Sequence, residues 1–222
     1  MHNTWKVAWF VVLICIPSTS FAGIIFESAT LGQTGLTLLD MSNQSIPGSN
    51  VRGLVFQGVR FQFDSPVLTT RVGGHFIASE GGGSFFGAIV SLSDEFDFPD
   101  SAELSTSDVI GVAEMTFPDN SEEVFGDLNL VLHPGWYALV FGSELFSTQG
   151  KGVAVGNGSD LSTPSYFGWQ PSAPNLGWID FFGGSINQRF VVEGTIIPEP
   201  STLAILSSGL FMLLYLPLHW RR

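Results

Sequence analysis

A period-two alternation of apolar and polar residues is the feature that most constrains the fold of this chain of 222 residues. The segment RFQF at 60–63 alternates phenylalanine with polar side chains, and the segment DLNLVL at 127–132 does the same with leucine. Such alternation is typical of strands that bury one face. The clearest runs are 54–63, 67–78, 85–92, 109–117, 124–132, 136–141 and 188–196.

Clusters of glycine, proline, asparagine, aspartate and serine separate these runs, and Gly81-Gly82-Gly83 is a turn between two of them. No stretch between residues 23 and 197 keeps a helical spacing of apolar residues over several turns. About seven to ten short strands at this spacing predict an all-β domain, an antiparallel β-sandwich of jelly-roll-like kind. Phenylalanine, of which the chain has 20, supplies the aromatic area for a core between two sheets.

Residues 1–22 have the pattern of a secretory signal peptide. The apolar run at 7–16 is too short to span a bilayer comfortably. Small residues at Ser20 and Ala22 predict cleavage between Ala22 and Gly23. We therefore expect export through the Sec translocon and cleavage by signal peptidase, with an uncleaved anchor as the alternative.

The C-terminal segment, 198–222, has three parts in a fixed order. Two prolines prevent the preceding strand from continuing into a helix. The apolar run at 202–218 is 17 residues long, near the lower limit for a membrane span. Terminal arginines favour a cytoplasmic end, so residues 23–197 would form an extracellular domain. The parts are Pro198, Glu199, Pro200 and Ser201, then the apolar run, then Arg221 and Arg222.

This order resembles the bacterial PEP-CTERM sorting tail, and the alternative is a plain C-terminal anchor. The resemblance implies recognition by exosortase, a membrane-embedded cysteine protease that cuts near the Pro-Glu-Pro motif, in Gram-negative bacteria that make exopolysaccharide and form biofilms. It also implies transient anchoring in the inner membrane by a transmembrane helix, followed by a final location on the cell surface or outside the cell. Pro217 departs from the pattern because it interrupts the last turn of the expected helix.

Residues 23–197 hold five basic residues against 19 acidic ones, a net charge of −14. A domain this acidic repels phosphate groups, so we expect no nucleic-acid partner. The single cysteine of the chain, Cys15, lies in the expected leader. The domain that remains therefore has no disulfide and no thiolate metal site.

Acidic residues crowd one expected loop, and no Lys or Arg occurs between Arg71 and Lys151. Asp94, Asp97 and Asp100 are the candidate calcium ligands, because calcium prefers six to eight oxygen atoms. Their spacing fits no EF-hand, so the other interpretation is a solvated loop of like charges. Calcium is the only cofactor that the sequence suggests.

Aromatic residues mark a second expected loop region, rich in Gly, Pro and Asn. Tyr166, Trp169 and Trp178 are candidates for stacking on sugar rings, and the other interpretation is that they pin a long loop onto the sheet. The order and spacing of the expected strands resemble those of the choice-of-anchor β-sandwich domains that accompany PEP-CTERM tails. The resemblance covers residues 67–92, Phe98-Pro99 and 132–140. That resemblance implies an extracellular surface or matrix domain with no assigned reaction.

Catalytic signatures are weak. His75 and His133 are the only histidines of the domain, and neither has a partner at metal-ligand spacing. The nucleophile motif G-x-S-x-G is absent from the sequence, so we expect no enzyme and assign no catalytic or metal residue. The sequence favours an exported surface or matrix protein associated with exopolysaccharide. The alternative is a lectin-like module that binds carbohydrate or calcium.

Overall fold

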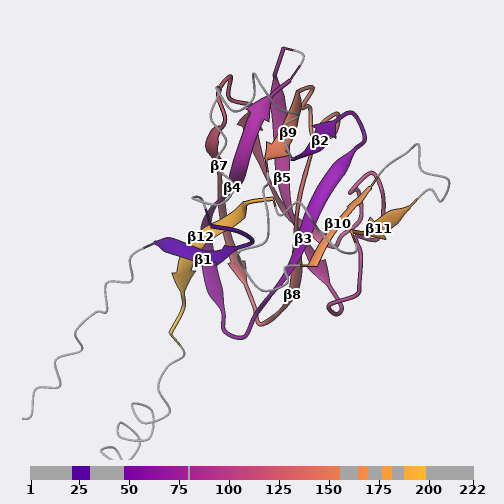
Figure 1. Ribbon diagram of the computed structural model, residues 1–222. Coiled ribbons are helices and arrows are strands. Elements are labelled where there is room, and N and C mark those ends of the chain that lie inside the picture. The colour runs from indigo at the N-terminus through magenta and orange to yellow at the C-terminus, as the bar shows by residue number, and fades with distance from the viewer. Residues whose placement is uncertain are drawn as a thin grey trace, which may run out of the picture.

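The computed structural model describes residues 22–30, 48–79, 81–155, 165–169, 177–181 and 188–198. The expected leader up to residue 21 and the sorting tail from residue 199 onward lie outside these ranges. Within them the chain is all-β, and two antiparallel sheets pack in a sandwich-like arrangement, which confirms the prediction of an all-β, sandwich-like domain (Figure 1). No helix in this part of the chain is long and apolar enough to cross a membrane.

The first sheet contains both ends of the described chain. Its strands are β1 (Gly23–Glu27), β2 (Gly48–Arg52), β4 (Val67–Ala78), β7 (Glu122–Leu132), β9 (Lys151–Val155) and β12 (Phe190–Ile196). They follow the order β1-β12-β4-β9-β2, and β7 also pairs with β4. The long strand β4 therefore organises this sheet, since it pairs with β12 near its start, with β9 at its end and with β7 along most of its length.

The second sheet has six strands. They are β3 (Phe56–Phe63), β5 (Ser84–Leu92), β6 (Val109–Thr116), β8 (Gly135–Gly142), β10 (Ser165–Trp169) and β11 (Trp178–Asp180). Their order is β11-β10-β3-β8-β5-β6. The chain changes sheet from β2 to β3, β3 to β4, β4 to β5, β6 to β7, β7 to β8, β8 to β9, β9 to β10 and β11 to β12.

Phenylalanine fills the space between the sheets. Phe76 on β4 lies at the centre, with its ring centroid 4.7 Å from Phe85 and 4.9 Å from Phe141 on the facing sheet. Phe61 and Phe190 are buried in the same core. Because each fully buried side chain of this size contributes about 1.5–3 kcal/mol, this cluster is the main source of cohesion between the sheets.

The second sheet is apolar on its outer face as well. A separate buried cluster lies there, formed by Phe56, Phe86, Ala88, Val90, Leu92, Leu104, Ala138, Val140 and Phe167. Residues 93–108, which we call the acidic segment, cover part of this face, because Leu104 and Phe98 pack into the cluster. Arg60 is consequently buried although it alternates with core phenylalanines on β3.

The seven clearest predicted strands correspond to β3, β4, β5, β6, β7, β8 and β12. The sequence pattern does not identify β1, β2, β9, β10 and β11, each of which has five residues or fewer. A strand of this length shows at most two periods of alternation, too few to stand out. The turn at Gly81–Gly83 is present, and its three glycines have φ angles of 96°, 67° and 105°, which L side chains rarely adopt.

Candidate functional site

The aspartates of the acidic segment stabilise its own turns. Asp97 accepts hydrogen bonds from the backbone N–H of Ser93 at 2.7 Å and of Phe98 at 2.8 Å. These bonds, the one from Ser93 first, lower the pKa of Asp97. Asp94 accepts from the N–H of Phe96 at 2.8 Å. The contact of Asp94 is an Asx turn, and local bonds of this kind are the arrangement expected for a solvated loop.

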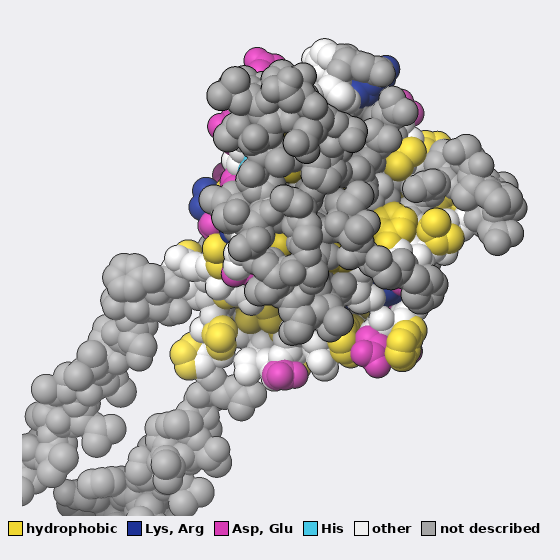
Figure 2. Space-filling model, viewed as in Figure 1, with side chains coloured by type: hydrophobic (Ala, Val, Ile, Leu, Met, Phe, Trp, Pro, Cys, Tyr) yellow, Lys and Arg dark blue, Asp and Glu magenta, His cyan; other side chains and the backbone are white. Residues whose placement is uncertain are grey.

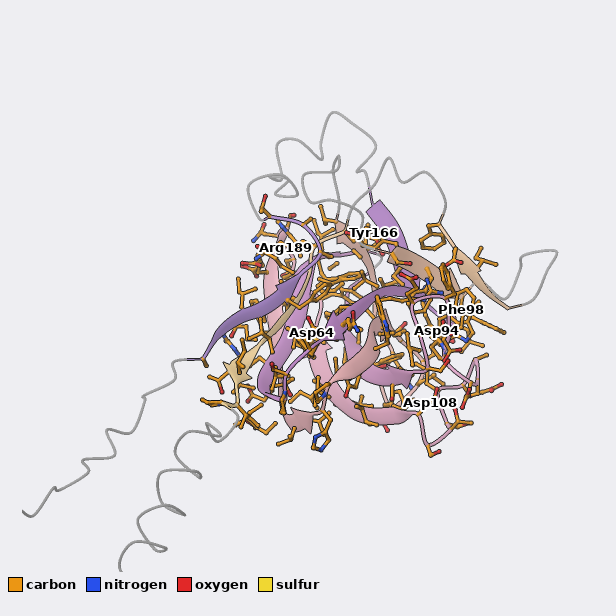
Figure 3. The ribbon with its side chains drawn as sticks, turned by 90° about the horizontal axis from the view of Figure 1, so that it is seen from below. Asp64, Asp94, Phe98, Asp108, Tyr166 and Arg189 are labelled. Carbon is orange, nitrogen blue, oxygen red and sulfur yellow. The ribbon has the colours of Figure 1, made fainter. Side chains whose placement is uncertain are left out.

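The candidate calcium ligands are not gathered around one point. Asp100 contributes its backbone N–H, which donates to the Asp108 carboxylate at 2.8 Å. Within the described residues, no three His, Cys, Asp or Glu side chains are arranged to hold a metal ion. Figure 3 shows Asp94, Phe98 and Asp108 on one side of the domain. Phe98 and Leu104 of the segment pack into the buried cluster on the sheet.

Arg60 fastens the acidic segment to the second sheet. Its guanidinium carbon lies 4.4 Å from the ring centroid of Phe98 and 4.6 Å from that of Phe167, so the cation contacts two aromatic rings that are themselves edge to face. Its Nε donates to the carbonyl of Asp97 at 2.7 Å, and Nη1 donates to the Asp180 carboxylate at 2.6 Å. One buried arginine therefore joins β3, the acidic segment and β11.

The three candidate sugar-stacking residues lie in different environments. Tyr166 is buried between the sheets, and its hydroxyl donates to the carbonyl of Gln188 at 2.6 Å, so its ring presents no open face to a sugar. Trp169 and Trp178 are half-buried cross-strand partners on the β10–β11 hairpin, edge to face with ring centroids 5.6 Å apart. Trp178 also packs on Phe167 at 5.5 Å. The two tryptophans thus pin the hairpin to the sheet while leaving part of their surface exposed.

A polar cluster that no sequence pattern predicts lies on the outer face of the first sheet. Arg189 lies beside the start of β12, where its Nε donates to Glu123 at 2.6 Å and its Nη1 donates to Glu27 at 2.5 Å. Its Nη1 also donates to the carbonyl of Ala29. Burial alone would lower the pKa of Arg189, but the hydrogen bonds to Glu27 and Glu123 outweigh it and raise that pKa. No sequence signal links these residues, because they come from three distant strands.

His75 lies next to this cluster on β4. Its Nε2 is 2.7 Å from the hydroxyl oxygen of Ser121, and burial lowers its pKa. A serine nucleophile needs a histidine whose second ring nitrogen is oriented by another group. The described residues give Nδ1 of His75 no hydrogen-bond partner. The pair therefore lacks the third member of a catalytic triad within this part of the chain.

A groove of about 620 Å³ lies between the Gly81–Gly83 turn and the connection from β6 to β7. Asp119, Glu122 and Glu123 line it, so its character is acidic. Acidic side chains at a rim do not define a ligand on their own, and we assign no function to this groove.

Both ends of the described chain leave the fold at one corner. Gly23 on β1 is the cross-strand partner of Gly194 on β12, and the two strands lie side by side at the lower left of Figure 1. The ladder of β12 continues to Ile196, and the N–H of Ile197 donates to the carbonyl of Pro66 at 2.8 Å. The expected signal-cleavage residues, Ala22 and Gly23, therefore lie close to the end of the last strand.

The chain matches no family model, and a search of curated proteins finds no match. Functional conclusions for this chain accordingly rest on its own residues and geometry.

Proposed function

We propose that this chain is an exported cell-surface or extracellular-matrix protein of a Gram-negative bacterium, sorted by an exosortase-type protease and associated with exopolysaccharide. Its domain serves for display or adhesion and carries out no reaction. Its partners are the Sec translocon and signal peptidase at the N-terminal end, the sorting protease at the C-terminal end, and exopolysaccharide in the final location.

The observation that carries this proposal is the pairing of β1 with β12. It holds the chain from Gly23 onward and up to Ile197, so the folded domain fits between the two segments that the sequence predicts to be processed. A domain that began well before Gly23 or continued well beyond Ile197 would leave folded structure inside a cleaved segment. Because β1 begins at Gly23 and β12 ends at Ile196, two processing steps outside residues 23–197 would spare every described strand.

We propose further that the sandwich is jelly-roll-like. The support is the repeated crossing of the chain between sheets at β3, β4 and β5 and again at β6, β7 and β8, since such crossings are the property that separates Greek-key sandwiches from simple meanders.

The test is an intact-mass measurement on the protein from its native host, with and without the sorting protease, combined with cell fractionation. We expect the loss of residues 1–22 in both strains, and a second cut near Pro198–Ser201 in the strain that has the protease. A protein that still ends at Arg222 in both strains would overturn the sorting proposal and leave an ordinary anchored envelope protein.

A second candidate function is carbohydrate binding by the β10–β11 hairpin. It is favoured by Trp169 and Trp178, whose partly exposed rings extend an aromatic row that continues into Phe56 on β3. Exposed tryptophan faces are the surfaces on which sugar rings stack in binding proteins. We expect Trp169→Ala to reduce retention of the protein on immobilised exopolysaccharide from the same host, whereas Phe96→Ala, a change at an exposed aromatic residue of the acidic segment, leaves it unchanged. Equal retention of both variants would exclude this hairpin as the sugar site.

A further inference from the structure

Exposed apolar side chains gather at the corner where the chain ends leave the domain. Five of the nine large hydrophobic side chains that are exposed in the described residues lie there, each between 37% and 59% exposed. We call them the corner patch: Ile24, Leu68, Val131, Ile196 and Ile197. In Figure 2, hydrophobic side chains are visible at the lower left of the domain, the region that β1 and β12 occupy in Figure 1.

The strand register places Ile24, Leu68 and Val131 on the outer face of the first sheet. Ile196 lies opposite the buried Val67, so it belongs to the inner face at the end of β12. Leu68 on β4 lies directly opposite Val131 on β7, and on its other side it lies opposite Thr195 on β12. Side chains directly opposite each other on antiparallel strands share one face and lie about 4.5–5.5 Å apart. Ile24 is paired with Glu193, one step further along the same face of β12. The patch therefore spans β1, β12, β4 and β7 at one end of the sheet.

The short segment that follows β12 limits how far the corner patch can lie from the membrane. Four residues, 198–201, separate Ile197 from the apolar run at 202–218. Even fully extended, the chain from Ile197 to residue 202 reaches only about 17 Å. The headgroup region on each side of the ~30 Å hydrocarbon core is about 5–7 Å thick. If the apolar run spans the bilayer, the corner patch is held within about 10–12 Å of the headgroups by chain length alone.

The expected leader approaches the same corner. Its apolar run ends at residue 16, and only residues 17–22 separate that run from Gly23, the first residue of β1. Two membrane-directed segments would therefore hold the same end of the sandwich toward the bilayer before either is cut.

The charge of the domain favours a neutral lipid surface over an anionic one. Arg71 forms an ion pair with Glu193 at 2.5 Å beside the patch, so neither charge is left uncompensated there. The domain as a whole is strongly acidic, and Asp64 is exposed in the neighbouring β3–β4 turn. Anionic headgroups would repel such a domain, whereas neutral headgroups would allow apolar side chains to enter the interface.

We infer that the corner patch docks on the neutral phospholipid surface of the membrane that anchors the tail. Burying Leu68, Val131 and Ile197 at the headgroup level fixes the orientation of the domain, with the first-sheet corner toward the lipid and the Gly81–Gly83 turn away from it. This inference rests on the membrane anchor of the proposed function.

The test uses the full chain purified from membranes of a host without the sorting protease, in a Cys15→Ser background. That change leaves an introduced cysteine as the only thiol whether or not the leader has been removed. An environment-sensitive fluorophore is attached at Leu68→Cys in the patch or at Leu54→Cys. Leu54 is the matched control, because it is the same residue type, is 42% exposed, and precedes β3 at the opposite end of the sandwich.

Both proteins are reconstituted into phosphatidylcholine vesicles that contain nitroxide-labelled lipid. We expect the probe at Leu68→Cys to shift to shorter wavelength and to lose most of its emission, and the probe at Leu54→Cys to keep its emission. Replacing part of the phosphatidylcholine with phosphatidylglycerol should weaken the quenching at Leu68→Cys.

Absence of quenching at both positions, in protein that resists alkaline extraction from the vesicles, would overturn the docking and leave the anchor standing. Release of the protein by alkaline extraction would overturn the anchor and the docking together. A probe at Leu68→Cys that is shielded equally in detergent, in a species of doubled mass, would show that a second copy of the chain covers the patch and would also overturn the lipid contact.

Discussion

Arg189 and Glu27 are 162 residues apart in the sequence, and Nη1 of the arginine lies 2.5 Å from Oε2 of the glutamate. The same guanidinium binds Glu123 through Nε, so one buried cation connects β1 to β7 across the start of β12. The cluster stabilises the first sheet, which contains the first and the last described strands.

Replacing this cation should destabilise the fold. We expect Arg189→Leu to lower the free energy of unfolding by about 2–4 kcal/mol, because it leaves two carboxylates without their partner. Both carboxylates retain some solvent access, which keeps the loss below that of a fully buried pair. Arg71→Leu is the matched control on the same sheet, and since the Arg71 side chain is exposed, its loss should cost less than about 1 kcal/mol. Urea unfolding followed by tryptophan fluorescence measures both variants, and equal losses would contradict a special role for Arg189.

Gly142 on β8 should not accept a side chain. A Cβ atom at this position would lie 2.3 Å from Cδ1 of Phe56 and 2.6 Å from Cζ of Phe86, two buried rings that meet above the glycine. We expect Gly142→Ala to cost about 1–3 kcal/mol through overpacking. Gly177→Ala is the control, because nothing lies within 4 Å of the added methyl group. Thermal melting of the two variants gives the comparison, and an unchanged midpoint for Gly142→Ala would show that the rings can move apart at little cost.

His75 should make stability depend on pH in the weakly acidic range. Its pKa is lowered in the folded state by burial, with Glu122, Glu123 and Arg189 as the charged groups around it. Below about pH 6.5 the unfolded chain therefore binds a proton that the folded chain does not, and stability falls as the pH drops from there toward the folded-state pKa. Urea midpoints measured between about pH 5 and 8 should show this loss, and His75→Gln should remove it. If the urea midpoint of His75→Gln changes with pH as steeply as that of the parent, other groups cause the effect.

Asp97 should act in the same direction as His75 but at lower pH, because the pKa of both groups is lowered in the folded state. The N–H groups of Ser93 and Phe98 hold its pKa below the ordinary value, so its contribution to stability is present above about pH 4 and is lost as the pH falls through the folded-state pKa. We expect Asp97→Asn to cost about 1 kcal/mol at neutral pH, since an amide oxygen accepts these bonds more weakly than a carboxylate. Asp100→Asn, a change at an exposed neighbour, should cost nothing measurable. Identical melting curves for the two variants at neutral pH would contradict the turn-capping role of Asp97.

The sequence predicts the long strands well and the site poorly, for physical reasons. Strands such as β4 and β7 bury one face over many residues, so alternation identifies them. Alternation predicts that Arg60 is exposed, but it is buried because the acidic segment covers that outer face of the sheet. Tyr166 resembles a loop aromatic in sequence, but the pairing of β10 with β3 brings it between the sheets. The cluster around Arg189 depends on the register of β1, β4, β7 and β12, which no local pattern encodes.

The pairing of β1 with β12 has a consequence for the order in which the molecule is made. Among the described strands β1 bonds only to β12, so the first strand to emerge from the ribosome has no partner in its sheet until nearly all of the domain has been synthesised. Contacts of such long sequence separation form slowly, and the unpaired strands that wait for them are prone to aggregate. In the nascent chain β1 therefore remains unpaired until β12, its partner in the first sheet, has been synthesised.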